Sequence, residues 1–534
     1  MRRIDPSAWL LAASSAILQI LVFPRASLYF LGWICLAPLL VAIFRAQRRE
    51  NVLLIEAGGP YFQHLEPATP GQAFVLGYFN GVMWYAGSCY WIYHVMHIYG
   101  GLAAPVAAGI LLLFCLYLAL YHGLFGALLA LGARRFQPVA DTKRAVLLAP
   151  FLWVAVELAR ARITGFPWDL LGTSQAGNIP LTRIATITGV YGLSFEILLI
   201  NAAFAAAILV SAFRRRRLLV SAFVAATLLQ AGSLAGPPPA ATDRSATLVQ
   251  ENIPILEGDW TPELLQTTLA SLGEFSLSQK KESSPGLIIW PESPAPFFIT
   301  DQTFHRAVSE IASRSNAYVV AGSLDVRAPG GRERPAELSN SAALIAPDGT
   351  WVARYDKIHL VPFGEYVPFK SVLVFAQKLT REVGDFAPGT ERTVFALGKA
   401  RLAVFICYES IFPDEIRQFA VRGAQFFVNI SNDGWFGESG APEQHLNMAR
   451  MRAIENRRWL LRSTNTGITA SIDPYGRVVA RAPRNIRTAL QAPYALLAGT
   501  TFYTRHGDWF AYACAIISAL ALLVRFRFRA ARLR

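Results

Sequence analysis

The sequence is short of charged residues. Asp, Glu, Lys and Arg together make up 16% of its 534 residues, whereas about a quarter of an average soluble domain is charged. Hydrophobic residues reach 53%, and the mean hydropathy is +0.35. This composition excludes a disordered chain, and it also excludes a protein that is soluble throughout. Much of the chain is therefore expected to lie in lipid.

Acidic residues are the scarcer of the two charge types. The 36 Asp and Glu residues face 50 Lys and Arg residues, which leaves a net charge of +14. Such an excess is typical of nucleic-acid binding, of contact with anionic lipid, or of loops kept on the cytoplasmic side of a membrane. The position of the basic residues along the chain has to separate these explanations.

Cysteine is rare, and no two cysteines have the Cys-x-x-Cys spacing of zinc or thioredoxin-like sites. The sequence also lacks a P-loop and a dinucleotide-binding fingerprint, so we expect neither a metal nor a cofactor. Four of the five cysteines lie in long apolar runs, and only Cys407 lies in a region with the composition of a soluble domain.

Long apolar runs are the most prominent feature that the sequence does have. A helix that crosses a bilayer needs about 20 mainly apolar residues. We predict eight such helices, at about 8–24, 27–44, 74–96, 102–132, 145–161, 189–213, 218–236 and 508–524. The first run follows Arg2 and Arg3 but lacks a good cleavage site, which favours a retained helix over a signal peptide.

The basic residues gather in every second connection between these runs. The segments 1–7, 45–72, 133–144, 214–217 and 525–534 hold 18 basic and five acidic residues, and so carry nearly all of the net charge of +14. With eight spans, all five segments fall on one side, which the positive-inside rule makes the cytoplasm. Both termini are then cytoplasmic, and residues 245–500 face outward, into the periplasm of a bacterium.

This topology predicts four parts of the chain: a membrane domain of seven helices at 1–236, a Pro-rich linker at 237–244, an outward domain at 245–500, and a last helix with a basic tail at 501–534. The outward domain alternates strand-like and helix-like runs, which is typical of an α/β fold. Predicted strands are 246–250, 286–290, 317–321, 401–407 and 425–430, and predicted helices are 303–314, 412–421 and 443–461. Hairpins are predicted at 340–355 and 466–480.

Reactive side chains follow several of the strands, where open α/β sheets hold their chemistry. Cys407 follows one strand as a candidate nucleophile for an acyl group, and Glu292 follows another as a candidate base. Lys357 follows the first hairpin and could stabilise an oxyanion. His359 is an alternative base, and Cys407 alone could equally be a small buried hydrophobic residue.

Taken together, these segments resemble the nitrilase superfamily, and with the flanking spans the chain is similar to the bacterial apolipoprotein N-acyltransferase family. The strings that carry the resemblance are Val249–Pro254, Trp290–Ser293, Tyr355–Pro368, Cys407–Glu409 and Ser431–Phe436, with Gly165–Gly172 and Gln175 in the membrane half. The resemblance implies an α-β-β-α sandwich inserted into a polytopic helical membrane protein.

The resemblance also implies a role for each matching residue. Cys407 would be the nucleophile, Glu292 the general base and Lys357 the stabiliser of the oxyanion. Glu365 would orient Lys357 or the incoming amine, and Tyr408 and Glu409 would support the site. Trp260, Trp435, Phe436 and Trp168 would contact the substrates.

The reaction implied is acyl transfer through a thioester. An acyl chain of a phospholipid, typically phosphatidylethanolamine, would pass to Cys407 and then to the α-amino group of the diacylglyceryl-cysteine that begins an apolipoprotein. The enzyme would act as a monomer in the bacterial inner membrane, without cofactor or nucleic acid.

Two alternatives remain open from the sequence. A membrane-tethered amidase of the nitrilase type would share Glu292, Lys357 and Cys407, but one span would suffice to anchor it. A non-catalytic transporter or scaffold would explain the spans and the intramembrane carboxyls of Glu157 and Glu196. It would leave an outward-facing free thiol at Cys407 without a function.

Overall fold

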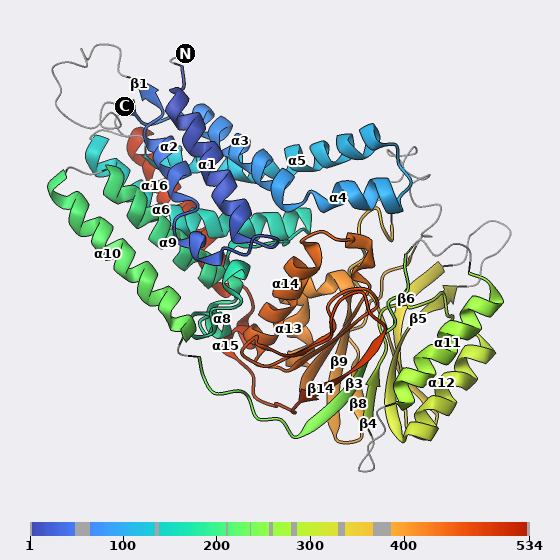
Figure 1. Cartoon of the computed structure of the whole chain (residues 1–534). Helices are drawn as coiled ribbons and strands as arrows, with labels where there is room; N and C mark the ends of the chain where they lie inside the picture. Colours follow the sequence, from blue (N-terminus) through green and yellow to red (C-terminus); the bar gives the residue numbers. More distant parts are fainter. Residues whose placement is uncertain are drawn as a thin grey trace. The chain divides into compact units, whose positions relative to one another are not determined.

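The computed structural model describes residues 3–48, 65–133, 138–209, 212–234, 236–255, 260–278, 286–328, 337–366 and 386–530. The predicted loop at 51–70 lies mostly outside this part. The chain divides into two compact units, one made of Met1–Tyr93, Pro105–Pro237 and Asp508–Arg534, the other of His94–Ala104 and Pro238–Gly507 (Figure 1). By their contacts, residues 94–104 and 238–507 form the second unit, and the four parts predicted from the sequence stay predictions.

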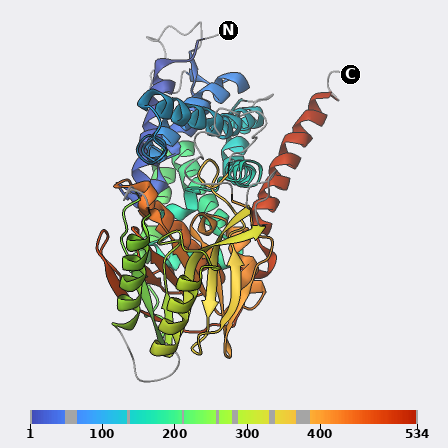
Figure 2. The same ribbon diagram turned by 90° about the vertical axis from the view of Figure 1, so that its right-hand side faces the viewer.

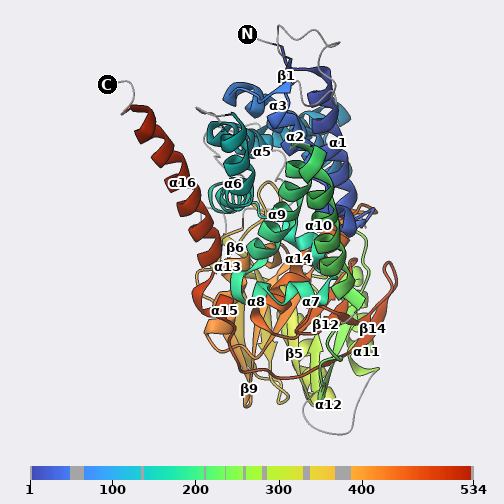
Figure 3. The same cartoon turned by 90° about the vertical axis from the view of Figure 1, so that its left-hand side faces the viewer.

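The first unit is helical. Its main helices are α1 (Pro6–Val22), α2 (Ala37–Phe44), α3 (Pro70–Ser88), α5 (Ala104–Ala133), α6 (Pro138–Ala159), α9 (Val190–Leu209), α10 (Ala212–Ala231) and α16 (Trp509–Ala530). Short helices are α4 (Trp91–His94), α7 (Ile179–Thr182) and α8 (Ala185–Thr188), and β1 (Gln47–Arg48) pairs with β2 (Leu65–Glu66). The last helix returns to the unit from the far end of the sequence, where α16 contacts α6 and α9 (Figure 3).

Each predicted span overlaps at least one helix of this unit, but the helices differ in length from the predicted spans. In the described part of the chain, α5 and α9 are the two helices long and apolar enough to cross a membrane. Pro6–Val22, Tyr29–Phe44 and Trp509–Val524 are apolar and shorter. The structure therefore shows a helical, largely apolar N-terminal region, and the number of spans stays a prediction.

Helices α3 and α5 approach each other through glycine. A Cβ atom on Gly77 would lie 2.3 Å from the carbonyl oxygen of His122, and one on Gly126 would lie 2.2 Å from the carbonyl oxygen of Ala73. The two backbones are therefore in direct contact. Close approach at small residues is the usual way in which helices associate in lipid, where the hydrophobic effect gives them no driving force.

The second unit contains two six-stranded sheets. The first has the order β14-β3-β4-β5-β6-β7 and the second β13-β12-β11-β10-β9-β8. The strands are β3 (Arg244–Gln250), β4 (Gly286–Ile289), β5 (Ala317–Ala328), β6 (Glu337–Ile345), β7 (Trp351–Asp356), β8 (Val394–Leu397), β9 (Ala400–Ile406), β10 (Phe426–Ser431), β11 (Leu460–Thr464), β12 (Ala470–Ile472), β13 (Val478–Arg481) and β14 (Thr488–Tyr494). In each sheet three central strands, β3-β4-β5 and β9-β10-β11, run parallel.

The two sheets face each other, and helices cover their outer sides. Contacts join β11 to β3 and β6 to β9, and the Ser463 hydroxyl donates to the carbonyl oxygens of Val249 and Ile289 at 2.8 and 3.2 Å. Helices α11 (Pro262–Leu277) and α12 (Gln302–Ser315) lie on the first sheet (Figures 1 and 2). Helices α13 (Pro413–Val421) and α14 (Ala441–Asn456) accompany the second sheet, and the short α15 (Phe502–His506) contacts both of them. The unit is thus an α-β-β-α sandwich.

The predicted strands, helices and hairpins of this unit are all present, with two larger differences in extent. The strand predicted at 317–321 continues to Ala328 as β5. The helix predicted at 443–461 ends at Asn456, because Arg457 adopts a left-handed conformation with φ +50° and β11 then begins at Leu460. The hairpin of β6 and β7 turns at Asp348–Gly349, where Gly349 has φ +84°. The second predicted hairpin is β12–β13, which turns at Pro474–Gly476.

The contact between α3 and α5 gives a test of the first unit. Gly126→Ala should lower the free energy of unfolding by about 1–3 kcal/mol, because its new Cβ meets the backbone of α3. Gly109→Ala on the same helix meets nothing within 4 Å and should be neutral or stabilising by up to about 1 kcal/mol. Thermal unfolding of the full chain in detergent measures both. Equal effects of the two substitutions would contradict the close approach.

Candidate active site

A buried lysine lies between two carboxylates at one end of the first sheet. Lys357 directly follows β7, and its side chain is 1% exposed. Its Nζ donates to Glu365 Oε1 at 2.8 Å and to Glu292 Oε1 at 3.2 Å. Burial lowers the pKa of Lys357, but the charges of Glu292 and Glu365 more than offset this, and the pKa lies well above its usual value. The lysine is therefore a fixed positive charge.

Asn340 joins the two carboxylates from the side. Its Nδ2 donates to Glu292 Oε1 at 2.7 Å and to Glu365 Oε1 at 2.9 Å, and its carbonyl oxygen accepts from the Lys357 backbone N–H at 2.9 Å. No motif or local pattern singles out Asn340. It lies within β6, and only the antiparallel pairing of β6 with β7 brings it beside Lys357.

The carboxylate of Glu292 is held from both of its oxygens. Trp290 directly follows β4 and is fully buried, and the indole N–H of Trp290 donates to Ser276 Oγ at 2.9 Å. Glu292 comes two residues later. Glu292 Oε2 accepts from the backbone N–H of Asn432 at 2.9 Å, and Asn432 directly follows β10 of the second sheet. Glu292 thus spans the junction of the two sheets, with both of its carboxylate oxygens accepting hydrogen bonds.

Glu409 ties the lysine loop to the segment that carries the cysteine. Its Oε1 accepts from the Tyr355 hydroxyl and the Ile358 N–H, both at 2.7 Å, and from the His359 N–H at 3.2 Å. Its Oε2 accepts from the Ile406 N–H at 2.6 Å. The side chain is fully buried, so its contacts with the Lys357 and Cys407 segments are shielded from water.

Cys407 follows β9 in a strained backbone conformation, with φ +49°. A left-handed conformation costs a residue with a side chain about 1–2 kcal/mol, and such strain is often found at functional positions. Burial raises the pKa of the Cys407 thiol, the charge of Glu292 raises it further, and the charge of Lys357 lowers it. The resting side chain is therefore a neutral thiol that needs a base before it can attack.

Lys357 and Glu292 act on Cys407 electrostatically, so the three residues predicted from separate strands occupy one site. Glu365 lies against Lys357, and Tyr408 lies beside the cysteine, where its ring packs edge-on against Phe412 at 5.2 Å. The alternative base His359 points elsewhere, because its Nε2 lies 3.2 Å from Glu415 Oε2 and its ring stacks on Phe412.

The predicted substrate-contacting aromatics are spread over both units. In the second unit, Trp260 packs on the core between the first sheet and its helices, and Trp435 packs edge-on against Tyr99 with ring centroids 5.8 Å apart. Phe436 packs against His445 at 6.0 Å. Trp168 belongs to the first unit, where it is buried between Trp91 and Phe166. Their roles as substrate contacts stay predictions.

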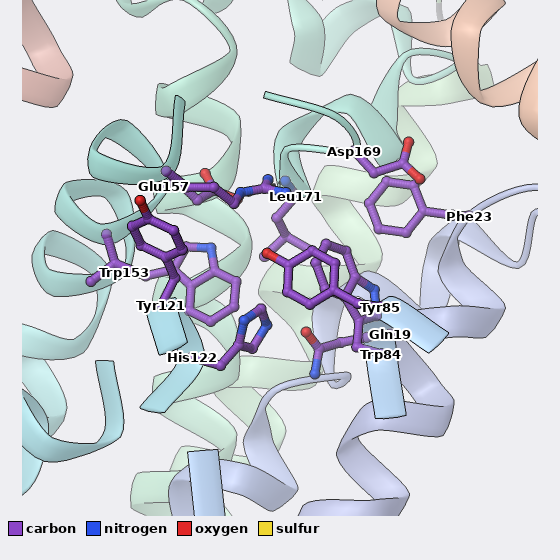
Figure 4. Close-up of a pocket in the computed structure, with 12 residues that line it drawn as sticks. Gln19, Phe23, Trp84, Tyr85, Tyr121, His122, Trp153, Glu157, Asp169 and Leu171 are labelled. Carbon is purple, nitrogen blue, oxygen red and sulfur yellow. Dashed lines mark hydrogen bonds between the residues drawn. The ribbon is translucent and has the colours of Figure 1, made fainter. Parts of the chain in front are cut away.

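The carboxyl of Glu157, which lies in a predicted span, has a structural partner in the first unit. Its Oε1 accepts from the Leu171 N–H at 2.8 Å, and the buried Arg160 donates to the Trp168 carbonyl oxygen at 2.8 Å. Both residues line a small pocket together with Trp84, Tyr85 and His122 (Figure 4). Glu157 and Arg160 therefore hold the backbone of the loop 168–171.

In the described residues, no group of three or more His, Cys, Asp or Glu side chains could hold a metal ion. All five cysteines are buried and free of disulfide bonds.

Comparison with known proteins matches both parts of the chain. Residues 245–496 match the carbon-nitrogen hydrolase family model, and residues 15–203 match the N-terminal domain of apolipoprotein N-acyltransferase. An apolipoprotein N-acyltransferase of Geobacter metallireducens is 36% identical over 97% of this chain and 95% of its own length. The chain belongs to the apolipoprotein N-acyltransferase family. The family resemblance seen in the sequence is thus confirmed.

Many other proteins are similar to this chain, among them a second family member and a solved structure. The apolipoprotein N-acyltransferase of Methylococcus capsulatus is 35% identical over 83% of this chain and 85% of its own. The crystal structure of Nit3 from Saccharomyces cerevisiae, a nitrilase-superfamily protein, is 18% identical, covers 48% of this chain and 90% of its own, and gives a TM-score of 0.37.

The contacts of Glu409 predict the effect of removing its charge. Glu409→Gln places an N–H₂ group against at least one of the N–H or O–H groups that now donate to Glu409. The loss of such a hydrogen bond costs about 1.5–3 kcal/mol. We therefore expect acylation of Cys407 to slow at least about tenfold. Glu310→Gln, on the exposed face of α12, is the matched control. Single-turnover acylation with a labelled phospholipid measures both, and a wild-type rate in Glu409→Gln would refute the role of these contacts.

The raised pKa of Cys407 predicts a pH dependence. Alkylation by a small neutral reagent requires the thiolate, so its rate should be low at pH 7 and rise continuously up to about pH 9.5, past the pKa of about 8.5 of a free thiol. Quantitative mass spectrometry of the Cys407 peptide gives the rate at each pH. A plateau below pH 8 would show a preformed thiolate and contradict the expectation.

Proposed function

We propose that this protein transfers an acyl chain from a phospholipid, through a thioester on Cys407, to the N-terminal amine of a lipoprotein. The observation that supports it most is one buried site with a thiol, a doubly held lysine and an anchored carboxylate, in a chain whose two halves both match this family. Each of these groups supplies one requirement of acyl transfer.

In the first half-reaction, Cys407 Sγ attacks the ester carbonyl carbon of the phospholipid. Glu292 accepts the thiol proton as the C–S bond forms, and Lys357 neutralises the oxyanion of the tetrahedral intermediate. The C–O bond then breaks, and Glu292 returns the proton to the departing oxygen of the lysophospholipid. A thiol with a raised pKa suits this order, because its proton leaves only when the base and the substrate are both present.

In the second half-reaction, the α-amino group of a diacylglyceryl-cysteine attacks the thioester carbon. Glu292 takes a proton from the attacking amine and passes it to the departing sulfur as the C–S bond breaks, so that the amide forms and the thiol of Cys407 is restored. Glu365 keeps Lys357 in place during both half-reactions, since it holds the lysine at 2.8 Å. Tyr408 and Glu409 support the nucleophile, and Trp260, Trp435, Phe436 and Trp168 contact the lipid substrates.

Eight transmembrane helices would hold this site at the outer surface of the bacterial inner membrane. The domains would be those predicted from the sequence, with 245–500 in the periplasm and both termini in the cytoplasm. Support comes from the alternating basic connections, from the apolar helices α5 and α9, and from the glycine contacts of α3 with α5. Both substrates are anchored in the bilayer, which is why the site has to lie at its surface. We further propose phosphatidylethanolamine as the donor and a monomeric enzyme.

The test follows the acyl chain. Purified protein incubated with phosphatidylethanolamine carrying a labelled acyl chain should form a hydroxylamine-sensitive adduct on Cys407, and the label should move to a diacylated lipopeptide with a free amine. Cys407→Ala should form no adduct, and Glu292→Gln should form it at least about a hundredfold more slowly, as general-base catalysis contributes about 10²–10⁴-fold.

An adduct of normal size in Cys407→Ala, or none in the wild type, would refute the mechanism. Discharge of the adduct to water alone, with the lipopeptide amine left unlabelled, would instead support an amidase of the nitrilase type. Reporter fusions after residues 217 and 500 test the topology separately. A cytoplasmic reporter signal at residue 500 would reject the proposed orientation.

A further inference from the structure

A second buried polar cluster lies behind the nucleophile and has no part in the mechanism above. It consists of Ser431, Asp433, His445 and Arg462, and we refer to it as the His445 cluster. All four side chains are fully buried. Asp433 accepts from Arg462 Nη2 with both oxygens, at 3.0 and 2.8 Å, and its Oδ1 also accepts from the Ser431 hydroxyl at 2.8 Å.

His445 connects this cluster to the main chain of the nucleophile. It lies on α14, and its Nε2 is 3.0 Å from the carbonyl oxygen of Cys407 and 2.8 Å from Ser410 Oγ. Its Nδ1 lies 3.0 Å from both Asp433 Oδ1 and Arg462 Nη2. The imidazole therefore bridges three elements, the end of β10, the strand β11 and the turn that begins at Cys407.

The partners of the ring determine its tautomer. A carbonyl oxygen can only accept, so Nε2 must carry a hydrogen. Arg462 can only donate, so an unprotonated Nδ1 accepts from it, whereas Asp433 at the same distance could accept only from a protonated Nδ1, and the charge state of the ring decides between them. Burial and the charge of Arg462 lower the pKa of His445. The charge of Asp433 raises it, but the net shift in the pKa is downward. The ring is thus neutral, with its proton directed at Cys407.

The carbonyl that accepts this hydrogen bond belongs to Cys407, whose backbone is left-handed, with φ +49°. Such a residue stays left-handed only where its surroundings hold it. The side chain of Glu409 holds the preceding residue, because its Oε2 accepts from the Ile406 N–H at 2.6 Å. His445 supplies the corresponding hydrogen bond on the carbonyl side of Cys407.

We propose that His445 is a positioning residue for the reaction. Its Nε2–H holds the carbonyl of Cys407, and thereby keeps the nucleophile in the left-handed conformation that directs its thiol toward Glu292 and the acyl ester. Asp433 and Arg462 fix the ring in that orientation. The inference rests on the proposed role of Cys407, but it assigns His445 no contact with substrate.

Two amide substitutions separate the two sides of the ring. The amide nitrogen of Gln lies three bonds from Cβ, as Nε2 of histidine does, and can still donate to the Cys407 carbonyl. The amide nitrogen of Asn lies two bonds from Cβ, as Nδ1 does, and can reach only the Asp433 side. His445→Gln should therefore retain most of the acylation rate that His445→Asn and His445→Ala lose.

The experiment measures acyl-enzyme formation in the full-length protein with labelled phosphatidylethanolamine. We expect the maximal rate to fall about tenfold in His445→Asn and His445→Ala, since each loses one hydrogen bond in the reacting geometry, with an unchanged KM for lipid. His445→Gln should stay within about threefold of the wild type. His305→Gln, at an exposed position of α12, is the control histidine.

Two measurements keep the outcomes distinct. Thermal unfolding shows whether a variant has simply lost stability, and alkylation of Cys407 by a small reagent reports the placement of the thiol without any lipid. Equal rates in the Gln and Asn variants, or losses that follow the unfolding temperature, would overturn the proposal. If the wild type forms no adduct, the proposed function fails, and the alkylation rates alone decide. They should then change in the Asn and Ala variants and stay at the wild-type value in the Gln variant.

Discussion

The site depends on one ammonium group that is held out of water. An ionised lysine is costly to bury unless it is paired and hydrogen-bonded, and Lys357 satisfies this with two carboxylates at 2.8 and 3.2 Å. Those carboxylates come from different loops, and Asn340 links them. The positive charge thus compensates two buried carboxylates at one point, and both would lose their charged partner if the lysine were absent.

The junction of the two sheets turns this charged group into a site for chemistry. Glu292 and Lys357 follow strands of the first sheet, whereas Cys407 follows a strand of the second. Glu409 connects the two through four hydrogen bonds, and Glu292 reaches across to the backbone of Asn432. Because the nucleophile and its base belong to separate sheets, small movements between the sheets would alter their distance directly. The buried hydrogen bonds oppose such movements.

Much of this could be predicted from local pattern. Apolar runs located every long helix of the first unit, and strands that end in Glu292 and Cys407 identified the reactive groups, because strand ends are visible in one stretch of sequence. Asn340 and His445 were missed for the opposite reason. Asn340 acquires its partners through the register of β6 with β7, and His445 through the packing of α14 behind Cys407. No periodicity within either segment carries that information, and hydropathy alone likewise leaves the number of membrane spans unconfirmed.

Strand β14 has a consequence for how the protein comes to exist in active form. It forms the edge of the first sheet beside β3, although it lies at residues 488–494, far beyond every residue of the site. Until the ribosome has released that segment, β3 presents an open hydrogen-bonding edge and the sheet that carries Glu292 is incomplete. Cys407 is synthesised before β14, so the sheet that supports Glu292 is completed only after the nucleophile has been made. Synthesis therefore delays the assembly of the reactive site until the second unit is nearly complete.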